Sequence, residues 1–445
     1  MALIYIYNGI VLLHVIIAIT IVDATSSMHR NNEAYNLLLK IANYTSYLDV
    51  GTNSLSNATV HFDASGGTDH IFVNANLARI LLSTYRLQEK EEIGNGNQDY
   101  LDQGLAWCDT FSDLQANIIS SLGNSAGYWG AGYGEPSNCK PPLRGDCAHG
   151  GQIYFGDTGT AVTTLALCYR LADANRQARY LHILNQFATF VLEGSKTPPF
   201  NKKGTANSFV DEKTGAIGCG YYMCSNRTED DCSKIKGPSN LNCPSRSPYT
   251  IATGTTGAAF FAQLYSLTGN EKFKEVGENA VNYLFSVVLS QGEIPYILDG
   301  VNCSTVSTDG CKSVGGPWTF DTLSYVTEGV ASLSVNVANK NIILKKQWKS
   351  TVDYLLKTQN MDGYWGRLNS GDLMRSPRCL TLLSWWLEAV DTPKYQDKPV
   401  EAAIQRYINY VINHGEKEYG LFKNTITTGM VGIALADAIE FGISF

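Results

Sequence analysis

The sequence predicts an all-α fold in which six helical hairpins close into a ring, an (α/α)6 toroid. A segment of small residues that leads into an apolar helical run recurs along the chain, and an amphipathic stretch precedes each copy. Four copies align on a glycine, at Gly159, Gly257, Gly329 and Gly432. A unit that recurs in a fixed order is the signature of a repeat architecture.

Two further segments, Asp69 to Leu87 and Asp372 to Leu387, occupy the same place in the order but lack the glycine. With them the chain contains six apolar runs. The six amphipathic stretches that precede them begin near Asn32, Asp99, Ala178, Glu271, Ile342 and Val400. Six pairs of this kind predict six helical hairpins.

The last pair shows how the two helices of a hairpin differ. Ile404, Tyr407, Ile408 and Val411 are spaced i, i+3, i+4 and i+7, which is the apolar stripe of a helix with one wet side. The companion run, 433–439, is apolar almost all round, as expected of a helix buried between neighbours. We therefore predict an outer ring of amphipathic helices and an inner ring of buried ones.

The inner runs are rich in Gly, Ala, Ser and Thr, which allow helices to approach closely. A closed ring needs about this much sequence as one unit, so we predict a single domain over residues 30–445. The cysteine-rich segment at about 195–247 contains much Gly, Asn, Ser and Lys and is predicted to be a loop insertion over one rim.

In its architecture, over about residues 30–445, the chain resembles the six-hairpin glycosidase superfamily and its toroidal relatives, the lanthionine synthetase-like proteins and the terpenoid cyclases. One motif sharpens the resemblance. Gln359 to Trp365 has the Gln-x-x-Asp-Gly-x-Trp form found in terpenoid cyclases and in several six-hairpin carbohydrate enzymes. We interpret it as structural, with the Gln bonding helix-end backbone groups and the Trp packing on the next hairpin. A second Gly-Tyr-Trp-Gly, residues 127–130, follows the second outer helix.

The charge of the chain limits its possible partners, and the N-terminal segment indicates its compartment. Charged residues make up 17% of the chain and the net charge is −7, so the composition does not indicate a basic surface that would bind nucleic acid or an anionic membrane.

Residues 2–22 are apolar, and we predict a signal peptide over residues 1–24. The alternative is an uncleaved signal anchor that attaches the protein to a membrane. A cleaved signal peptide predicts a secreted or lumenal protein, and with either reading the rest of the chain is extracellular or lumenal. The sequons at Asn43, Asn57, Asn226 and Asn302 are compatible with glycosylation there.

The cysteines fall into two groups. Eight lie in predicted loops and can form local disulfides that staple the rim: Cys139, Cys147, Cys219, Cys224, Cys232, Cys243, Cys303 and Cys311. The other three, Cys108, Cys168 and Cys379, lie in predicted helices and are interpreted as buried thiols. Zinc on Cys147, His149 and the 219–243 cysteines is the rival reading, but the spacing does not reproduce the zinc motif of the lanthionine synthetase-like toroids. We predict no metal and no cofactor.

Polar groups from all six repeats are expected to converge at one mouth of the ring, where the inner helices begin. The residues expected there are Asp69, His70, Tyr154, Asp157, Thr253, Trp318, Asp321, Tyr325, Asp372, Arg375 and Arg378. Aromatic residues of the preceding loops offer flat partners for sugar rings, although many will simply pack. As substrate-binding residues we predict His70, Trp129, Tyr154, Trp318, Tyr325, Trp365, Asp372, Arg375 and Arg378. This pattern favours a carbohydrate substrate.

Glycoside hydrolysis usually needs one carboxyl group that protonates the leaving oxygen and a second that activates water or attacks the sugar. Asp157 and Asp321 are the predicted catalytic pair, because both precede inner helices, in repeats two and four. In six-hairpin enzymes a carboxylate near an inner-helix start often acts as acid or base, and the resemblance reaches Asp157 by position alone. The alternative interpretation is structural: each Asp stabilises the start of its helix by about 0.5–2 kcal/mol.

The sequence leaves several alternatives open. Glu328 lies within an apolar run and is either catalytic or paired with an Arg of the next hairpin. Arg375 and Arg378 either hold a substrate carboxylate or organise a neighbouring Asp. The protein as a whole is predicted to be a glycoside hydrolase; the alternatives are a polysaccharide lyase or other toroidal lyase or cyclase, or a secreted carbohydrate-binding protein without activity. The Asp-rich motifs of terpenoid cyclases are absent from the sequence.

Overall fold

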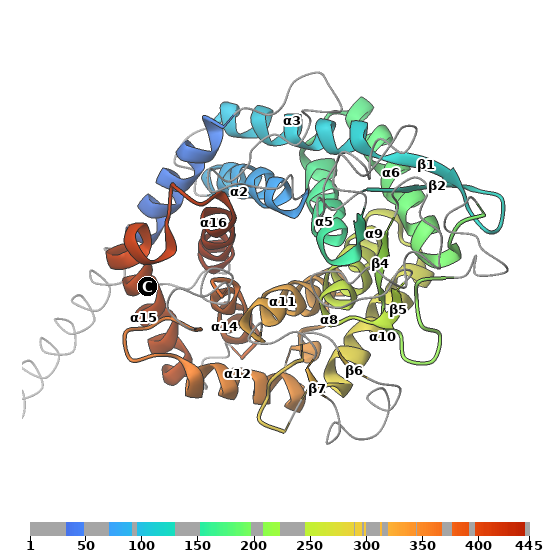
Figure 1. Cartoon of the computed structure of the whole chain (residues 1–445). Coiled ribbons are helices and arrows are strands. Elements are labelled where there is room, and N and C mark those ends of the chain that lie inside the picture. Colours follow the sequence, from blue (N-terminus) through green and yellow to red (C-terminus); the bar gives the residue numbers. More distant parts are fainter. Residues whose placement is uncertain are drawn as a thin grey trace, which may run out of the picture.

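The predicted ring of hairpins is confirmed by the computed structural model of the chain (Figure 1). The structure describes residues 33–48, 71–90, 96–129, 152–196, 208–222, 245–288, 290–295, 298–299, 312–313, 319–343, 345–366, 376–390 and 397–440. The predicted signal peptide and the sequons at Asn57, Asn226 and Asn302 lie outside these residues. No helix within them is both long and apolar enough to span a bilayer.

The described helices form an outer and an inner ring that alternate along the chain (Figure 1). The outer helices are residues 33–46, α3 (Gln98–Leu114), α6 (Ala174–Glu193), α10 (Glu271–Ser286), α12 (Lys346–Thr358) and α15 (Lys398–His414). The inner helices are α2 (Ile71–Lys90), α5 (Phe155–Leu171), the continuous run α8 (Thr250–Ala252), η2 (Thr253–Phe260) and α9 (Phe261–Thr268), then α11 (Thr319–Asn336), α14 (Arg378–Val390) and α16 (Thr425–Glu440). Two short turns, η3 (Lys340–Ile342) and η4 (Gly415–Tyr419), flank outer helices.

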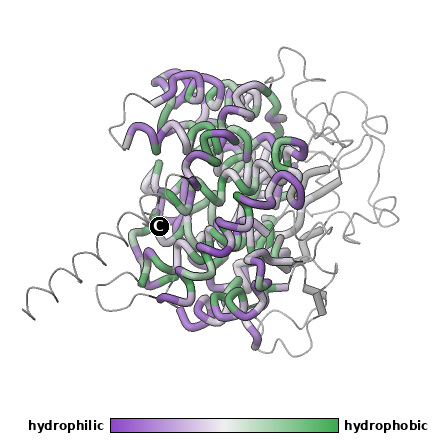
Figure 2. Tube along the Cα trace, turned by 90° about the vertical axis from the view of Figure 1, so that its left-hand side faces the viewer, coloured by the Kyte–Doolittle hydropathy of each residue, from purple (hydrophilic) through white to green (hydrophobic). Residues whose placement is uncertain are grey.

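The difference between outer and inner helices follows the sequence pattern. In α15 the stripe of Ile404, Tyr407, Ile408 and Val411 is buried, whereas in α16 every residue from 427 to 438 is buried. Seen from the side, the helices carry hydrophilic and hydrophobic positions in alternation (Figure 2). The core therefore fills the space between the two rings, where the apolar stripes of the outer helices face inner helices buried on all sides.

The ring closes where α16 lies beside α2, so the last inner helix packs on the first (Figure 1). Small residues make such contacts between inner helices close. A Cβ on Gly254 would lie 2.8 Å from the carbonyl oxygen of Tyr325, and a Cβ on Gly329 would overlap the carbonyl oxygen of Gly254. The third and fourth inner helices thus touch backbone to backbone, which the Gly-rich runs of the sequence predict.

Short antiparallel strands join the helices at their ends. The hairpin of β1 (Ala116–Ile119) and β2 (Ser125–Tyr128) follows α3. A three-stranded sheet of β3 (Gln152–Tyr154), β4 (Gly218–Tyr222) and β5 (Ser245–Pro248) has the order β3-β4-β5. Because β3 runs into α5 and β5 leads to α8, this sheet holds the starts of the second and third inner helices together. A last pair is formed by β6 (Leu298–Asp299) and β7 (Lys312–Ser313).

The third inner helix contains a π-helical segment, Thr253–Phe260, that the sequence pattern does not predict. Its threonine hydroxyls bond backbone carbonyls inside and outside the helix: Thr253 Oγ1 donates to Tyr249 O at 2.8 Å and Thr256 Oγ1 donates to Phe155 O at 2.5 Å. The second of these bonds ties the segment to the start of α5. Thr253, predicted at the mouth, is fully buried and structural.

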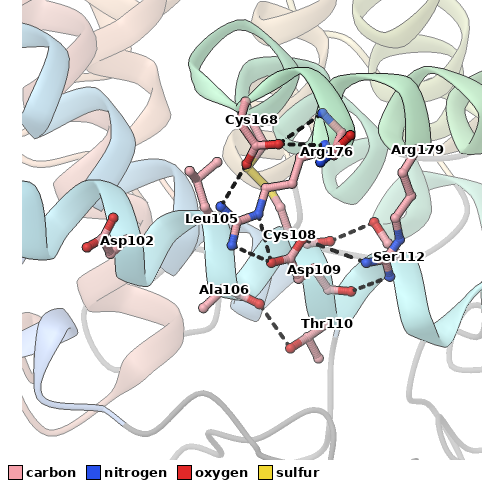
Figure 3. Close-up of polar contacts among 12 residues, drawn as sticks. Asp102, Leu105, Ala106, Cys108, Asp109, Thr110, Ser112, Cys168, Arg176 and Arg179 are labelled. Carbon is pink, nitrogen blue, oxygen red and sulfur yellow. Dashed lines mark hydrogen bonds and ion pairs between the residues drawn. A yellow bond between two sulfur atoms is a disulfide. The ribbon is translucent and has the colours of Figure 1, made fainter.

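The prediction for two of the helical cysteines is wrong. Cys108 of α3 and Cys168 of α5 form a disulfide, with a Cα–Cα distance of 6.5 Å, that joins the outer and inner helices of the second hairpin (Figure 3). Beside it, Arg176 of α6 pairs with Asp109 of α3 at 3.0 Å (Figure 3). Cys379 is a buried free thiol, as predicted. Of the eight loop cysteines, Cys219 lies on β4 and the others lie outside the described residues, so rim disulfides stay a prediction.

The Gln-x-x-Asp-Gly-x-Trp motif is structural, as predicted. Gln359 follows the last residue of α12, and its Nε2 donates to Gly363 O at 2.8 Å and to Ala403 O of α15 at 2.7 Å. Trp365 Nε1 donates to Leu355 O at 2.9 Å, and its ring packs on Tyr407. The motif therefore fastens the end of the fifth outer helix to the sixth.

The second hairpin repeats this arrangement, which we call the Gln–Trp clamp. Gln115 follows the last residue of α3, and its Nε2 donates to Ile183 O of α6 at 3.1 Å. Trp129 Nε1 donates to Phe111 O at 2.7 Å. In both clamps the indole bonds the carbonyl three residues before the last residue of the outer helix.

We expect Trp365→Phe to destabilise the fold by about 1–3 kcal/mol, because the indole hydrogen bond is lost and the smaller ring leaves a cavity. Trp129→Phe should cost a comparable amount, since its indole is equally buried and makes the equivalent hydrogen bond. The measurement is the shift of the urea midpoint at unchanged slope. Unchanged midpoints in both variants would show that the clamps do not hold the hairpins together.

Candidate active site

Asp157 is the third residue of α5 and is 6% exposed. The helix begins directly after β3, and its first turn packs on the start of the third inner helix: a Cβ on Gly156 would lie 2.7 Å from Ile251 Cγ2. A carboxylate in the first turn lies in the favourable field of the helix N-terminus. Asp157 is therefore held at the mouth of the ring, within the protein and not turned to bulk solvent.

Asp321 occupies the equivalent position, the third residue of α11. The two predicted catalytic residues thus begin the second and fourth inner helices, on either side of the third. Only the backbone of Asp321 belongs to the described part of the chain, as is also true of Tyr154 on β3, which pairs with Gly220 of β4. The distance between the two carboxyl groups stays a prediction.

The other predicted binding residues are placed as follows. Trp129 and Trp365 are 1% and 0% exposed and serve in the clamps. Stacking on a sugar needs an exposed ring face, which neither offers, so their assignment to the substrate is corrected. Tyr325 lies one turn beyond Asp321 in α11 and is buried. Four residues lie outside the described part of the chain: His70, Trp318, Asp372 and Arg375.

Arg378 is 3% exposed and lies in a buried cluster of four charges at the centre of the ring, which we call the axial cluster. Its Nη1 lies 3.6 Å from Glu328 Oε2, and its Nη2 lies 3.6 Å from Asp437 Oδ2. Arg79 forms an ion pair with Glu328 and lies 4.0 Å from Asp437. Two arginines thus face two carboxylates, contributed by the first, fourth, fifth and sixth inner helices.

The axial cluster resolves two of the alternatives that the sequence leaves open. Glu328 pairs with an Arg of the next hairpin, and Arg378 organises neighbouring carboxylates. Reasoning from sequence missed Arg79 and Asp437. The available signal was that each is an isolated ionisable residue inside an inner-helix run, the same signal that singled out Glu328.

The two carboxyl groups of the cluster respond differently to their surroundings. Burial alone would raise the pKa of Glu328, but the charges of Arg79 and Arg378 outweigh it and lower the pKa below its ordinary value. Burial also raises the pKa of Asp437, and here the arginines only partly offset it. Thr381 Oγ1 donates to Asp437 Oδ2 at 3.0 Å, which holds this carboxyl in place.

A cavity of about 210 Å³, the axial cavity, lies over this cluster. It is lined by Arg79, Ser83, Arg86, Thr163, Leu167, Arg170, Gln263, Glu328, Ala331, Ser332, Val335, Asn336, Arg378, Thr381, Trp385, Asp437 and Glu440. Most of these residues belong to the second halves of the inner helices, so the cavity lies towards the end of the ring away from Asp157. Within the described residues no group of three or more His, Cys, Asp or Glu is arranged to hold a metal ion.

No family model matches the chain, and a search of curated proteins finds no match. Solved structures do match. The α-1,6-mannanase GH76A of Salegentibacter sp. HEL1_6 superposes with a TM-score of 0.53 at 9% identity, covering 92% of this chain and 99% of that one. An inactive variant of that mannanase, in which two consecutive aspartates are replaced by alanine, has been solved with α-1,6-mannotetrose.

Two other solved structures share the architecture. A D-mannose isomerase matches with a TM-score of 0.57 at 9% identity, covering 91% of this chain and 97% of that one. A polysaccharide lyase matches with a TM-score of 0.51 at 13% identity, covering 92% and 98%. These similarities show that the chain has the (α/α)6 toroid fold.

Proposed function

We propose that this toroid is a carbohydrate-active enzyme, a glycoside hydrolase that uses Asp157 and Asp321 as its two carboxylates. The observation that carries the proposal is the position of Asp157, a carboxyl group that is 6% exposed at the start of an inner helix. A buried carboxyl group of this kind is suited to hold or release a proton at a bound substrate.

The pairing with Asp321 rests on the symmetry of the ring. Both residues are third in their helices, and the third inner helix separates those helices. In the proposed reaction one carboxylic acid protonates the glycosidic oxygen as the bond to the anomeric carbon breaks. The other carboxylate takes a proton from the water that attacks the anomeric carbon, or it bonds to the anomeric carbon itself. In the second case water then hydrolyses that bond, giving up a proton to the first residue. The axial cluster does not take part, because its charges are already paired with one another.

The carbohydrate substrate is proposed from the fold, which this chain shares with the matching proteins. The mannanase complex makes α-1,6-linked mannose the first substrate to test. We also propose that the protein is exported, because a disulfide between Cys108 and Cys168 is favoured in an oxidising compartment. N-terminal sequencing of the mature protein tests whether residues 1–24 are removed.

The experiment that tests the function is a screen of the purified full-length protein against mannan, other neutral oligosaccharides and uronate-containing polysaccharides, with products identified by mass. Hydrolysis adds one water for each bond cut and creates a reducing end, elimination creates an unsaturated sugar, and isomerisation leaves the mass unchanged. We expect hydrolysis. Elimination, isomerisation or no turnover on the whole panel would reject the proposal.

A further inference from the structure

The axial cavity is separate from the proposed catalytic residues. Its rim includes Arg170 in the last turn of α5, whereas Asp157 lies in the first turn of the same helix. Arg170 is 13 residues after Asp157. At about 1.5 Å of rise per residue this places them about 20 Å apart along the helix. A ligand of the cavity would therefore not contact Asp157.

The floor of the cavity is charged but balanced. It is the axial cluster, in which Arg79 and Arg378 face Glu328 and Asp437. The side chains of Glu328 and Arg378 are only 2% and 3% exposed. The floor therefore has two positive groups facing two carboxyl groups, and it leaves the choice of ligand to the rim.

The rim carries one positive charge in excess. Arg86 is paired with Glu440 at 2.8 Å, which neutralises both. Arg170 instead donates to neutral acceptors, Ala166 O at 3.0 Å, Ser266 Oγ at 2.6 Å and Asn336 Oδ1 at 3.4 Å, and no carboxylate of the described residues forms an ion pair with it. The cavity lining as a whole has four arginines against three carboxylates. A concave wall concentrates such a charge and attracts an anion.

The remaining lining suits a ligand with hydroxyl groups. Neutral donors and acceptors are supplied by Ser83, Thr163, Gln263, Ser332 and Asn336. The indole of Trp385 is half-buried at the wall and offers an apolar surface. At about 210 Å³ the cavity is smaller than the pockets of about 300–1,000 Å³ that hold larger ligands, so a single ring is the right size.

We propose that the axial cavity binds a small carboxylate ligand that carries hydroxyl groups, a sugar acid of one ring, with Arg170 contacting its carboxylate. The guanidinium fork suits this task because it bonds both oxygens of a carboxylate at once. This binding site is independent of the proposed hydrolase function.

A purely structural role for Arg170 makes a different prediction. The residue lies in the last turn of α5, where any cation is favoured by the field of the helix C-terminus. A lysine would satisfy that role, because it keeps the charge. Recognition of a carboxylate by two parallel hydrogen bonds would not survive the change. Arg170→Lys therefore separates the two roles.

The test is titration calorimetry of the full-length protein with D-glucuronate, with D-glucose as the matched neutral sugar and inorganic phosphate as a second anion. We expect saturable binding of glucuronate and at least tenfold weaker binding of glucose and phosphate. Arg170→Gln and Arg170→Lys should each weaken glucuronate binding by about tenfold or more, since each removes a charge-assisted hydrogen-bond pair. Arg179→Gln, on the outer helix α6, should leave it unchanged.

Three results would overturn the site: no saturable binding of glucuronate, equal binding of glucose or phosphate, or glucuronate binding unaffected by either Arg170→Gln or Arg170→Lys. Binding is read without turnover, so the result does not depend on catalysis. Asp157→Asn should bind glucuronate at this site like the parent protein. Failure of the cavity proposal and failure of the hydrolase proposal are therefore distinguishable.

Discussion

Glu328→Gln is expected to destabilise the protein by about 3–5 kcal/mol at pH 7, the largest effect on stability of any single change considered. The substitution keeps the shape of the side chain but removes its charge. Arg79 and Arg378 would then share only Asp437, and Arg378 is 3% exposed, so its charge cannot be solvated instead. Urea unfolding of parent and variant measures the loss.

The pH dependence of this loss follows from the direction of the pKa shift. The folded-state pKa of Glu328 is lowered relative to its ordinary value of 4.5. Its contribution to stability is therefore fully present above about pH 4.5 and disappears as the pH falls through the folded-state pKa. We expect the difference between parent and Glu328→Gln to be constant near neutrality and to shrink in acid.

Asp437→Asn is the matched control within the same cluster. Burial raises the pKa of Asp437, so its contribution to stability has the opposite sign: it is present below the ordinary value of 3.8 and is lost as the pH rises through the folded-state pKa. Removing this carboxyl should therefore cost less than removing Glu328. A larger loss for Asp437→Asn, or a Glu328→Gln protein as stable as its parent, would contradict the described charge balance.

Asp157→Asn is expected to lower turnover by about 10²–10⁴-fold or more while the protein stays folded, because proton transfer by a positioned carboxyl contributes that much. The amide has nearly the same shape and cannot carry the proton. The measurement is the rate of product formation on the substrate found in the screen, together with the thermal unfolding midpoint of parent and variant.

Asp173→Asn provides the control for a merely structural aspartate. Asp173 also begins a helix, and its carboxylate accepts from Asn175 N at 2.9 Å and Arg176 N at 3.1 Å at the start of outer helix α6. Asparagine caps helices about as well, so both turnover and stability should stay near the parent values. If Asp157→Asn behaves like Asp173→Asn, Asp157 only stabilises its helix.

The hairpin ring was predictable because its signal is local. An outer helix shows its apolar stripe within four turns, as α15 does, and an inner helix such as α16 is apolar on all sides because neighbours surround it. The sequence pattern predicts the first and last residues of the helices less accurately. The third outer helix begins at Ala174 rather than near Ala178, after the capping residue Asp173. Helix α12 begins at Lys346 rather than near Ile342, which lies in the turn η3.

Contacts between distant segments were not predictable from such patterns. The disulfide joins Cys108 and Cys168, 60 residues apart on two helices, and periodicity does not say which faces of two helices meet. Arg79 and Asp437 meet only because the first and last inner helices close the ring. Within the π-helical segment Thr253–Phe260, the hydroxyls of Thr255 and Thr256 donate to Phe155 O, a contact that needs the neighbouring helix in place.

The most direct test of the catalytic proposal is a crystal structure of Asp157→Asn bound to an oligosaccharide that the parent protein cleaves. We expect the scissile bond at the mouth of the ring, between Asn at position 157 and the carboxyl group of Asp321, with the two side chains about 5–10 Å apart. A sugar bound elsewhere, or an Asp321 carboxyl beyond that range, would contradict the assignment of these residues as the catalytic pair.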